Sequence, residues 1–109
     1  MTIQPTDKNF VDVCGTTEIS DGQGRMFFVG DMRIALYRIG DEYFALDDAC
    51  PHAGASLALG IISGSVVACR IHHWRFCIRS GEYLNDKKDS CNVRTYVVRQ
   101  VENRIQVAV

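Results

Sequence analysis

Short apolar segments separated by turn-forming residues constrain the fold of this chain more than any other feature of its sequence. The clearest pair, residues 34–39 and 43–46, flanks Gly40-Asp41, which suits the positive φ that tight hairpin turns demand. No 3.6-residue apolar period continues over a useful length. Many short strands at close intervals predict an all-β fold, an antiparallel β-sandwich or barrel. The other expected strands are residues 10–14, 26–29, 66–68, 74–79, 95–101 and 104–109, the last two forming a hairpin about Glu102-Asn103.

Two expected loops, residues 47–64 and 69–74, interrupt this strand pattern. The first is rich in small and turn-forming residues and contains Cys50 and His52. The second is shorter and contains Cys69 and His72. Binding residues concentrate on loops that a rigid framework positions. We therefore expect the chemistry of this chain to lie where these two loops meet.

The four residues form the pattern C-x-H followed by C-x2-H, with 16 residues between His52 and Cys69. Thiolates are soft, strongly donating ligands for iron, whereas neutral imidazole donates less charge. An iron–sulfur cluster bound by two of each is less negative, and easier to reduce, than an all-cysteine cluster. Zinc is the alternative metal, but structural zinc sites favour cysteine pairs at shorter C-x2–4-C spacings.

The two motifs resemble those of the Rieske iron–sulfur family at residues 50–57 and 69–76, followed by Gly81-Glu82-Tyr83. The resemblance extends from about residue 10 to the C-terminus, which implies a single domain over residues 1–109. It also implies a Rieske-like β fold in which the two loops form a small cluster-binding subdomain. By this resemblance one [2Fe–2S] cluster is expected, with Cys50 and Cys69 on the buried iron and His52 and His72 on the outer iron.

One departure from the family pattern is His73, because the position after the second ligand histidine is usually glycine in the family. Neighbouring residues do not easily direct their side chains to the same point, and the C-x2-H spacing selects His72 as the ligand. We expect His73 to be an exposed or packing residue.

Four other positions bear on the reduction potential that the resemblance implies. High-potential members carry a disulfide between the loops, and here the two positions are Ala55 and Ile71. Those members also place a serine and a tyrosine hydroxyl near the cluster sulfurs, where this chain has Trp74 and Phe76. Fewer hydrogen bonds to the sulfurs lower the potential. We therefore expect a potential in the lower part of the Rieske range.

The remaining cysteines, Cys14, Cys77 and Cys91, fit no all-cysteine cluster spacing and are expected to be small buried hydrophobes. No disulfide is expected, because the odd set of five cysteines occurs without an export signal. Three arginines near the second loop either dock an acidic partner or lie on an ordinary solvated face: Arg70, Arg75 and Arg79.

The composition excludes several classes of function. Apolar residues make up 47% of the chain and charged residues 23%, which is ordinary for a folded domain. The net charge of −1 and the absence of a basic stretch argue against a nucleic-acid partner. No apolar run reaches the roughly 18 residues that span a bilayer, and the first residues have no signal-peptide pattern. We expect no membrane association and a cytoplasmic location.

No catalytic triad, nucleotide-binding fingerprint or phosphate loop appears, so the chain is expected to be a one-electron carrier and not an enzyme. By the resemblance its donor is a reductase, and its acceptor is an oxygenase or a nitrite reductase. Residues 85–96 lack the prolines usual in dioxygenase ferredoxins and look more like the nitrite reductase small subunit. The alternative is a non-redox binding or assembly module with a structural cluster or zinc.

Overall fold

The computed structural model describes residues 9–51 and 54–109. Within these residues the chain forms ten strands and two 3-10 helices, and every strand pairing is antiparallel. In chain order they are β1 (Phe10–Gly15), β2 (Gln23–Val29), β3 (Met32–Ile39), β4 (Glu42–Asp47), η1 (Leu57–Leu59), β5 (Ile61–Ser63), β6 (Val66–Ala68), β7 (Arg75–Cys77), η2 (Asp89–Cys91), β8 (Thr95–Tyr96), β9 (Val98–Val101) and β10 (Arg104–Ala108).

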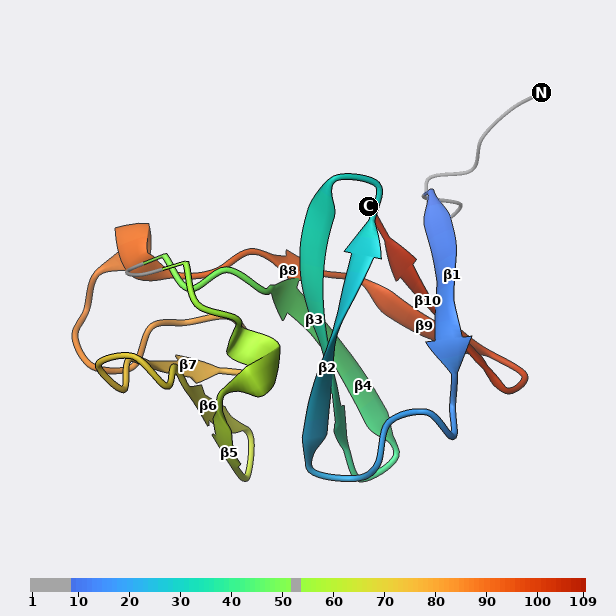
Figure 1. Cartoon of the computed structure of the whole chain (residues 1–109), viewed down its shortest axis with the longest axis horizontal. Helices are drawn as coiled ribbons and strands as arrows, with labels where there is room; N and C mark the ends of the chain where they lie inside the picture. The colour runs from blue at the N-terminus through green and yellow to red at the C-terminus, as the bar shows by residue number, and fades with distance from the viewer. Residues whose placement is uncertain (1–8, 52–53) are drawn as a thin grey trace.

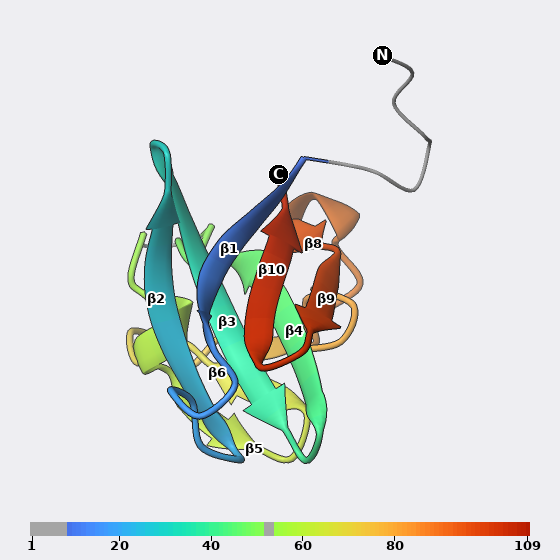
Figure 2. The same cartoon turned by 90° about the vertical axis from the view of Figure 1, so that its right-hand side faces the viewer.

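Two sheets pack against each other to form the β framework. One has the strand order β2-β3-β4-β8 and the other the order β1-β10-β9. Figure 2 shows β1, β10 and β9 lying across β3 and β4, so the framework is a sandwich of two twisted layers. This confirms the predicted all-β antiparallel fold.

A third sheet, with the order β5-β6-β7, lies with η1 and η2 at one end of the framework. Figure 1 shows this end on the left, away from β1, β9 and β10. Its residues come from the segment between β4 and β8, which are themselves hydrogen-bonded neighbours. The two loops predicted to carry the chemistry belong to this end of the molecule.

Strand β3 separates two buried cores, because successive side chains of a strand point to opposite faces. Ile34 and Leu36 point into the core between the two framework sheets, the sheet core. Ala35 and Tyr37 point the other way, into a core shared with the third sheet, the loop core. The other buried members of the sheet core are Cys14, Ile19, Val29, Ala45, Tyr96, Ile105 and Val107; those of the loop core are Leu46, Cys50, Leu57, Ala58, Val67, Cys69, Phe76, Ile78, Tyr83 and Val93.

The predicted loop at residues 47–64 is only partly irregular. Leu57 is fully buried in η1, and its backbone amide donates to the carbonyl of Asp48 at 2.7 Å. Ile61–Ser63 pairs with β6 as strand β5. The prediction of an unbroken loop was therefore wrong here, because apolar burial and a short pairing order residues 57–63.

The predicted strand at residues 95–101 was also wrong as a single element. It breaks at Val97, which is 50% exposed and whose carbonyl accepts a hydrogen bond from the Ala108 amide at 2.8 Å. Before this residue the chain pairs with β4, and after it with β10. The predicted strand at 74–79 is shorter than expected, and the predicted strand at 26–29 begins earlier, at Gln23.

No helix of the described residues is long and apolar enough to span a membrane.

Candidate metal centre

The first cysteine motif lies in a short closed loop after β4. The Cys50 amide donates to the Ala55 carbonyl at 2.9 Å, and the Gly54 amide donates back to the Cys50 carbonyl at 2.7 Å. Ala49 and Ser56 form a β-bridge below this turn. Cys50 is 2% exposed and belongs to the loop core. The backbone thus closes on itself around a thiol that faces inward, while His52 lies outside the described residues.

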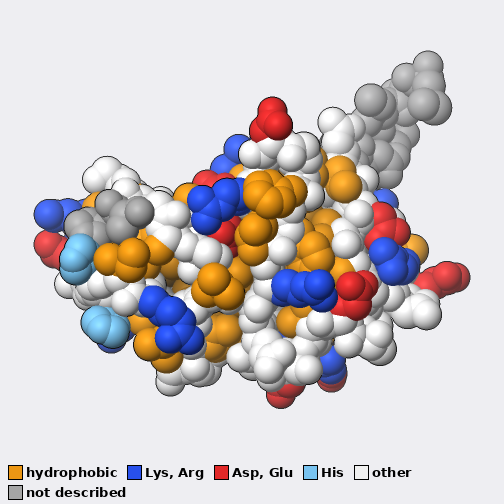
Figure 3. All heavy atoms as spheres, in the orientation of Figure 1, with side chains coloured by type: hydrophobic (Ala, Val, Ile, Leu, Met, Phe, Trp, Pro, Cys, Tyr) orange, Lys and Arg blue, Asp and Glu red, His pale blue; other side chains and the backbone are white. Residues whose placement is uncertain are grey.

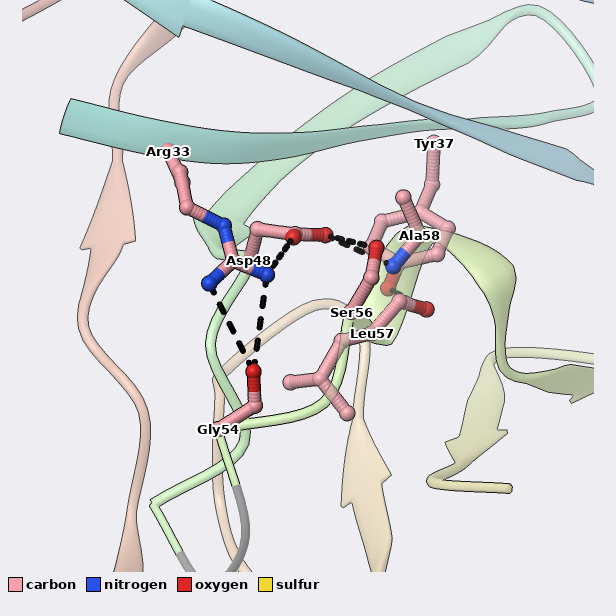
Figure 4. A network of polar contacts seen from close by, with 7 residues as sticks. All are labelled: Arg33, Tyr37, Asp48, Gly54, Ser56, Leu57 and Ala58. Carbon is pink, nitrogen blue, oxygen red and sulfur yellow. Dashed lines mark hydrogen bonds and ion pairs between the residues drawn. The ribbon is translucent and has the colours of Figure 1, made fainter. Parts of the chain in front are cut away.

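Asp48 fixes the base of this loop and is the one charged residue that is fully buried in the described part of the chain. One carboxylate oxygen accepts from the Ser56 hydroxyl at 2.8 Å and from the Ala58 amide at 2.9 Å. The other accepts from the Arg33 guanidinium at 2.8 Å, as Figure 4 shows. Buried charges need a partner and hydrogen bonds, and here both come from the loop and from β3.

Two further contacts of this network join β3 to the loop. The Arg33 guanidinium also reaches the Gly54 carbonyl at 3.5 Å, and the Tyr37 hydroxyl donates to the Leu57 carbonyl at 2.6 Å. Burial raises the pKa of the Tyr37 phenol, and the charge of Asp48 raises it further. Tyr37 therefore stays a hydrogen-bond donor, and the loop is attached to β3 through two side chains.

The second motif lies in the turn between β6 and β7. The Cys69 amide donates to the Trp74 carbonyl at 2.8 Å, which closes the turn, and Cys69 is fully buried in the loop core. His72 and His73 are both exposed and have positive φ values of 65° and 57°. Two successive non-glycine residues in this region are uncommon and each costs free energy. The turn thus presents two histidines at the surface above one buried thiol.

An aromatic group packs behind the second loop. The Trp74 and Tyr83 ring centroids lie 4.6 Å apart, and those of Phe76 and Tyr83 lie 5.7 Å apart. Phe76 is fully buried, and the Tyr83 amide donates to the Asn92 side chain at 2.9 Å. Trp74 and Phe76 therefore pack with Tyr83 as one aromatic cluster behind this loop.

The other cysteines only partly follow the prediction. Cys14 is buried but belongs to the sheet core, whereas Cys77 and Cys91 are only half-buried. Burial acts to raise the pKa of the Cys77 thiol, but hydrogen bonds to the Ser80 side chain and to the backbone of Ser80 and Arg79 outweigh it and lower that pKa. No disulfide joins any of the five cysteines, all of which the structure describes.

The donor set fits an iron–sulfur group. Cys50 and Cys69 come from two different closed loops, and both are buried in the loop core. Thiolates are the preferred ligands of such groups, and an imidazole can replace a thiolate on one iron. The exposed His72 belongs to the same turn as Cys69. The described residues therefore offer two buried thiols and one imidazole at the surface, although no three of their His, Cys, Asp or Glu side chains are grouped closely enough to hold a metal ion.

The sequence profile of the Rieske [2Fe-2S] domain matches residues 9–102 of the chain. The chain belongs to the Rieske family. Among relatives of this Rieske chain, the ferredoxin component of biphenyl 2,3-dioxygenase from Rhodococcus jostii is 33% identical over a region that spans 80% of each of the two proteins. The alkene monooxygenase ferredoxin component from Xanthobacter autotrophicus is 32% identical over 72% of this chain and 66% of that protein.

Solved structures agree with this family. The ferredoxin of carbazole 1,9a-dioxygenase from Nocardioides aromaticivorans has a TM-score of 0.82 at 29% identity, covering 91% of this chain and 96% of that one. A putative NADH-dependent nitrite reductase small subunit from Mycobacterium tuberculosis has a TM-score of 0.83 at 27% identity, covering 94% and 96%. The Rieske chain therefore carries one Rieske-type [2Fe–2S] cluster and is an electron-transfer protein, not a catalytic enzyme.

The sequence did not reveal Asp48, Arg33 and Tyr37 as supports of the Rieske loops. Arg33 and Asp48 are 15 residues apart and meet only because β3 and β4 pair. The signal that could have pointed to Asp48 is its position two residues before Cys50, at the end of an apolar strand. A carboxylate there has backbone amides of the following loop within reach.

Proposed function

We propose that this Rieske protein is the ferredoxin of an oxygenase system, taking single electrons from a reductase and passing them to an oxygenase. The observation that carries the proposal is the pair of buried thiols, Cys50 and Cys69, in two closed loops, with the exposed imidazole of His72 in the second. Buried thiols keep solvent from one side of a bound cluster, and an exposed imidazole gives the partner a short path to it.

We assign the cluster ligands as Cys50, His52, Cys69 and His72. The bound cluster supplies the one-electron couple. Cys50 and Cys69 would hold it from the loop core, and His52 and His72 would complete its ligand set. His52 is assigned from the C-x-H spacing of its motif, and His72 is preferred to His73 from the C-x2-H spacing. We also propose that residues 1–109 act as one domain.

Relatives favour an oxygenase over a nitrite reductase as the acceptor. The oxygenase ferredoxins above reach 33% identity, and the 3-phenylpropionate/cinnamic acid dioxygenase ferredoxin subunit of Photorhabdus laumondii reaches 38% over 66% of this chain. The nitrite reductase small subunit, at 27% identity, supports the second candidate. The proline-poor segment 85–96, exposed over most of its length, is the feature of this chain that favours that candidate.

The cytoplasm is the compartment we propose, because five cysteines without a disulfide suit a reducing environment. A non-redox module with a structural cluster or zinc is the competing function. Metal and sulfide analysis separates zinc from iron, and reversible one-electron reduction separates a carrier from a structural cluster.

Electron paramagnetic resonance of the anaerobically reduced protein tests the ligand set. We expect the low average g value of mixed histidine and cysteine ligation. His72→Cys should change this spectrum strongly, whereas His73→Ala, which alters the neighbouring exposed histidine, should leave it unchanged. The opposite result would move the ligand to His73, and a zinc-only protein would contradict the carrier function itself.

Protein-film voltammetry gives the potential. With Ala55 and Ile71 excluding the loop disulfide, and Trp74 and Phe76 offering no hydroxyl, we propose a value near the lower end of the range of roughly −150 to +300 mV. A clearly positive potential would contradict this part of the proposal.

A further inference from the structure

A groove of about 400 Å³ lies beside the second cysteine loop. It runs between the start of β2, the η1 helix and strand β5, and Arg70 closes it on the side of the loop. The described residues that line it are otherwise uncharged, so Arg70 alone sets its charge. We call it the Arg70 groove.

Within the described part of the chain, one hydrogen bond holds Arg70 in position. Its Nε donates to the Leu59 carbonyl, and it forms no ion pair with the residues that the structure describes. Arg79, by contrast, pairs with Glu42 at 3.3 Å and stacks over Phe44 at 4.8 Å. The terminal nitrogens of Arg70 can therefore meet a carboxylate in the two-pronged geometry that guanidinium favours.

Exposed apolar side chains lie in the groove with Arg70 and in the adjoining turn. Leu59 is 67% exposed, Ile61 46% and Ile71 45%. Leu59 and Ile61 line the groove, and Ile71 follows Arg70 in the turn that leads to His72. Figure 3 shows the exposed histidines at one end of the molecule, with a basic side chain and hydrophobic side chains gathered beside them. An arginine within an apolar surface is typical of residues that anchor protein interfaces.

We propose that the Arg70 groove docks the electron-transfer partner through a carboxylate that the partner presents among apolar side chains. The inference rests on the proposed function, because the groove would bind the electron-transfer partner beside the loop that contains His72. Charge complementarity selects this occupant: the groove offers one oriented cation, uncharged walls and an apolar rim. A second copy of the chain is the other occupant that the test must distinguish.

The test uses the full-length holoprotein and gold surfaces coated with a mixed monolayer of carboxylate-ended and methyl-ended alkanethiols. A quartz microbalance measures binding, and voltammetry on the same surface measures the redox couple. Arg70→Gln should weaken binding by about tenfold. The matched control Arg75→Gln removes the same charge from an exposed arginine outside the groove and should change binding little. Leu59→Ser, at a highly exposed site, should weaken binding to the mixed surface several-fold.

Equal binding of Arg70→Gln and Arg75→Gln would overturn the inference, since only net charge would then matter. An unchanged Leu59→Ser would also overturn it, because the apolar rim would have no role. Sedimentation velocity tests whether a second copy of the chain binds there. A wild-type dimer that Arg70→Gln dissociates would assign the groove to self-association instead. Binding does not need electron transfer, so a missing reversible wave with normal binding would contradict the proposed function and leave the docking surface standing.

Discussion

Asp48 has no contact with solvent, and its charge is balanced by one arginine and by hydrogen bonds from the loop it supports. The Arg33 side chain is 37% exposed, so water screens part of this pair. The value of the pair for the loop lies in its geometry, because the same carboxylate orients Ser56, the Ala58 amide and the Arg33 guanidinium.

Asp48→Asn tests this role. The amide keeps the shape but places a donor where an acceptor is needed, so we expect a loss of about 2–3 kcal/mol in the free energy of unfolding. Cluster loss on heating should occur at a lower temperature. Asp31→Asn removes the same charge from an exposed side chain and should stay within about 0.5 kcal/mol of the wild type. Equal effects of both substitutions would contradict the role of Asp48.

At the residue scale, the sequence pointed to two candidate cysteines but not to the residues that support their loops. The spacing of Cys50 and Cys69 pointed to two loops, and both thiols are buried in the loop core. The support from Arg33 depends on the pairing of β3 with β4, which places residues distant in sequence side by side. Such a contact has no local sequence signature.

A hydrogen bond of Tyr96 joins two elements of the fold and makes the stability of the protein depend on pH. The Tyr96 hydroxyl donates to Asp47, linking β8 to the end of β4. Burial first, and then this bond, raises the pKa of Tyr96 to about 12. The unfolded pKa is about 10, so the folded state favours the protonated phenol.

The stability from Tyr96 is therefore fully present below about pH 10 and is lost as the pH rises through about 12. Unfolding measured across this window should show a steeper fall for the wild type than for Tyr96→Phe. At pH 7, Tyr96→Phe should cost about 1 kcal/mol, since one hydrogen bond is lost. Parallel pH curves for the two proteins would refute the link.

Gly81 closes the turn after β7. It has a φ of +74°, and a Cβ there would lie 2.2 Å from the Val93 carbonyl oxygen. Gly64, in the β5–β6 turn, has a φ of +59° with nothing within 4 Å of an added Cβ. Both alanine variants incur the left-handed backbone cost of about 1–2 kcal/mol, and only Gly81→Ala adds a clash.

We therefore expect Gly81→Ala to destabilise by about 3 kcal/mol or more and Gly64→Ala by about 1 kcal/mol. Denaturant unfolding of both variants measures the difference. Similar losses would mean that the chain near Val93 moves aside without cost.

At the element scale, Gly40-Asp41 predicted the β3–β4 hairpin and Glu102-Asn103 predicted the β9–β10 hairpin, because the signal for a tight turn is local. The break at Val97 was not predictable from its apolar neighbours. It arises where one strand leaves β4 and joins β10, which is a property of the packed sheets. The ordered structure of residues 57–63 was not predictable for the same reason, since β5 is ordered by pairing with β6.

For the whole molecule, the division into a sheet core and a loop core predicts how it responds to loss of the cluster. Cys50 and Cys69 belong to the loop core alone, and the strained turn at His72 and His73 needs outside support. Removing iron under anaerobic chelation should raise amide hydrogen exchange in residues 54–59 and 69–74. Amides of β3 and β10 should stay protected.

Hydrogen exchange followed by mass spectrometry checks this, with the holoprotein as the reference. An equal rise in β3 and β10 would show that the two cores unfold together, which the placement of side chains along β3 does not suggest.

The pairing of β4 with β8 has a consequence for how such proteins can change. Ala45 pairs with Tyr96 and Leu46 with Thr95, and the Asp47 amide donates to the Arg94 carbonyl at 2.9 Å. The chain therefore leaves the framework at the end of β4 and returns to it at β8, which is hydrogen-bonded to that same end of β4. The segment between β4 and β8 can therefore be exchanged between related proteins in a chimera, provided that the loop-core residues of β3 and β4 are exchanged with it. Redox tuning and partner choice can then diverge while the scaffold stays the same.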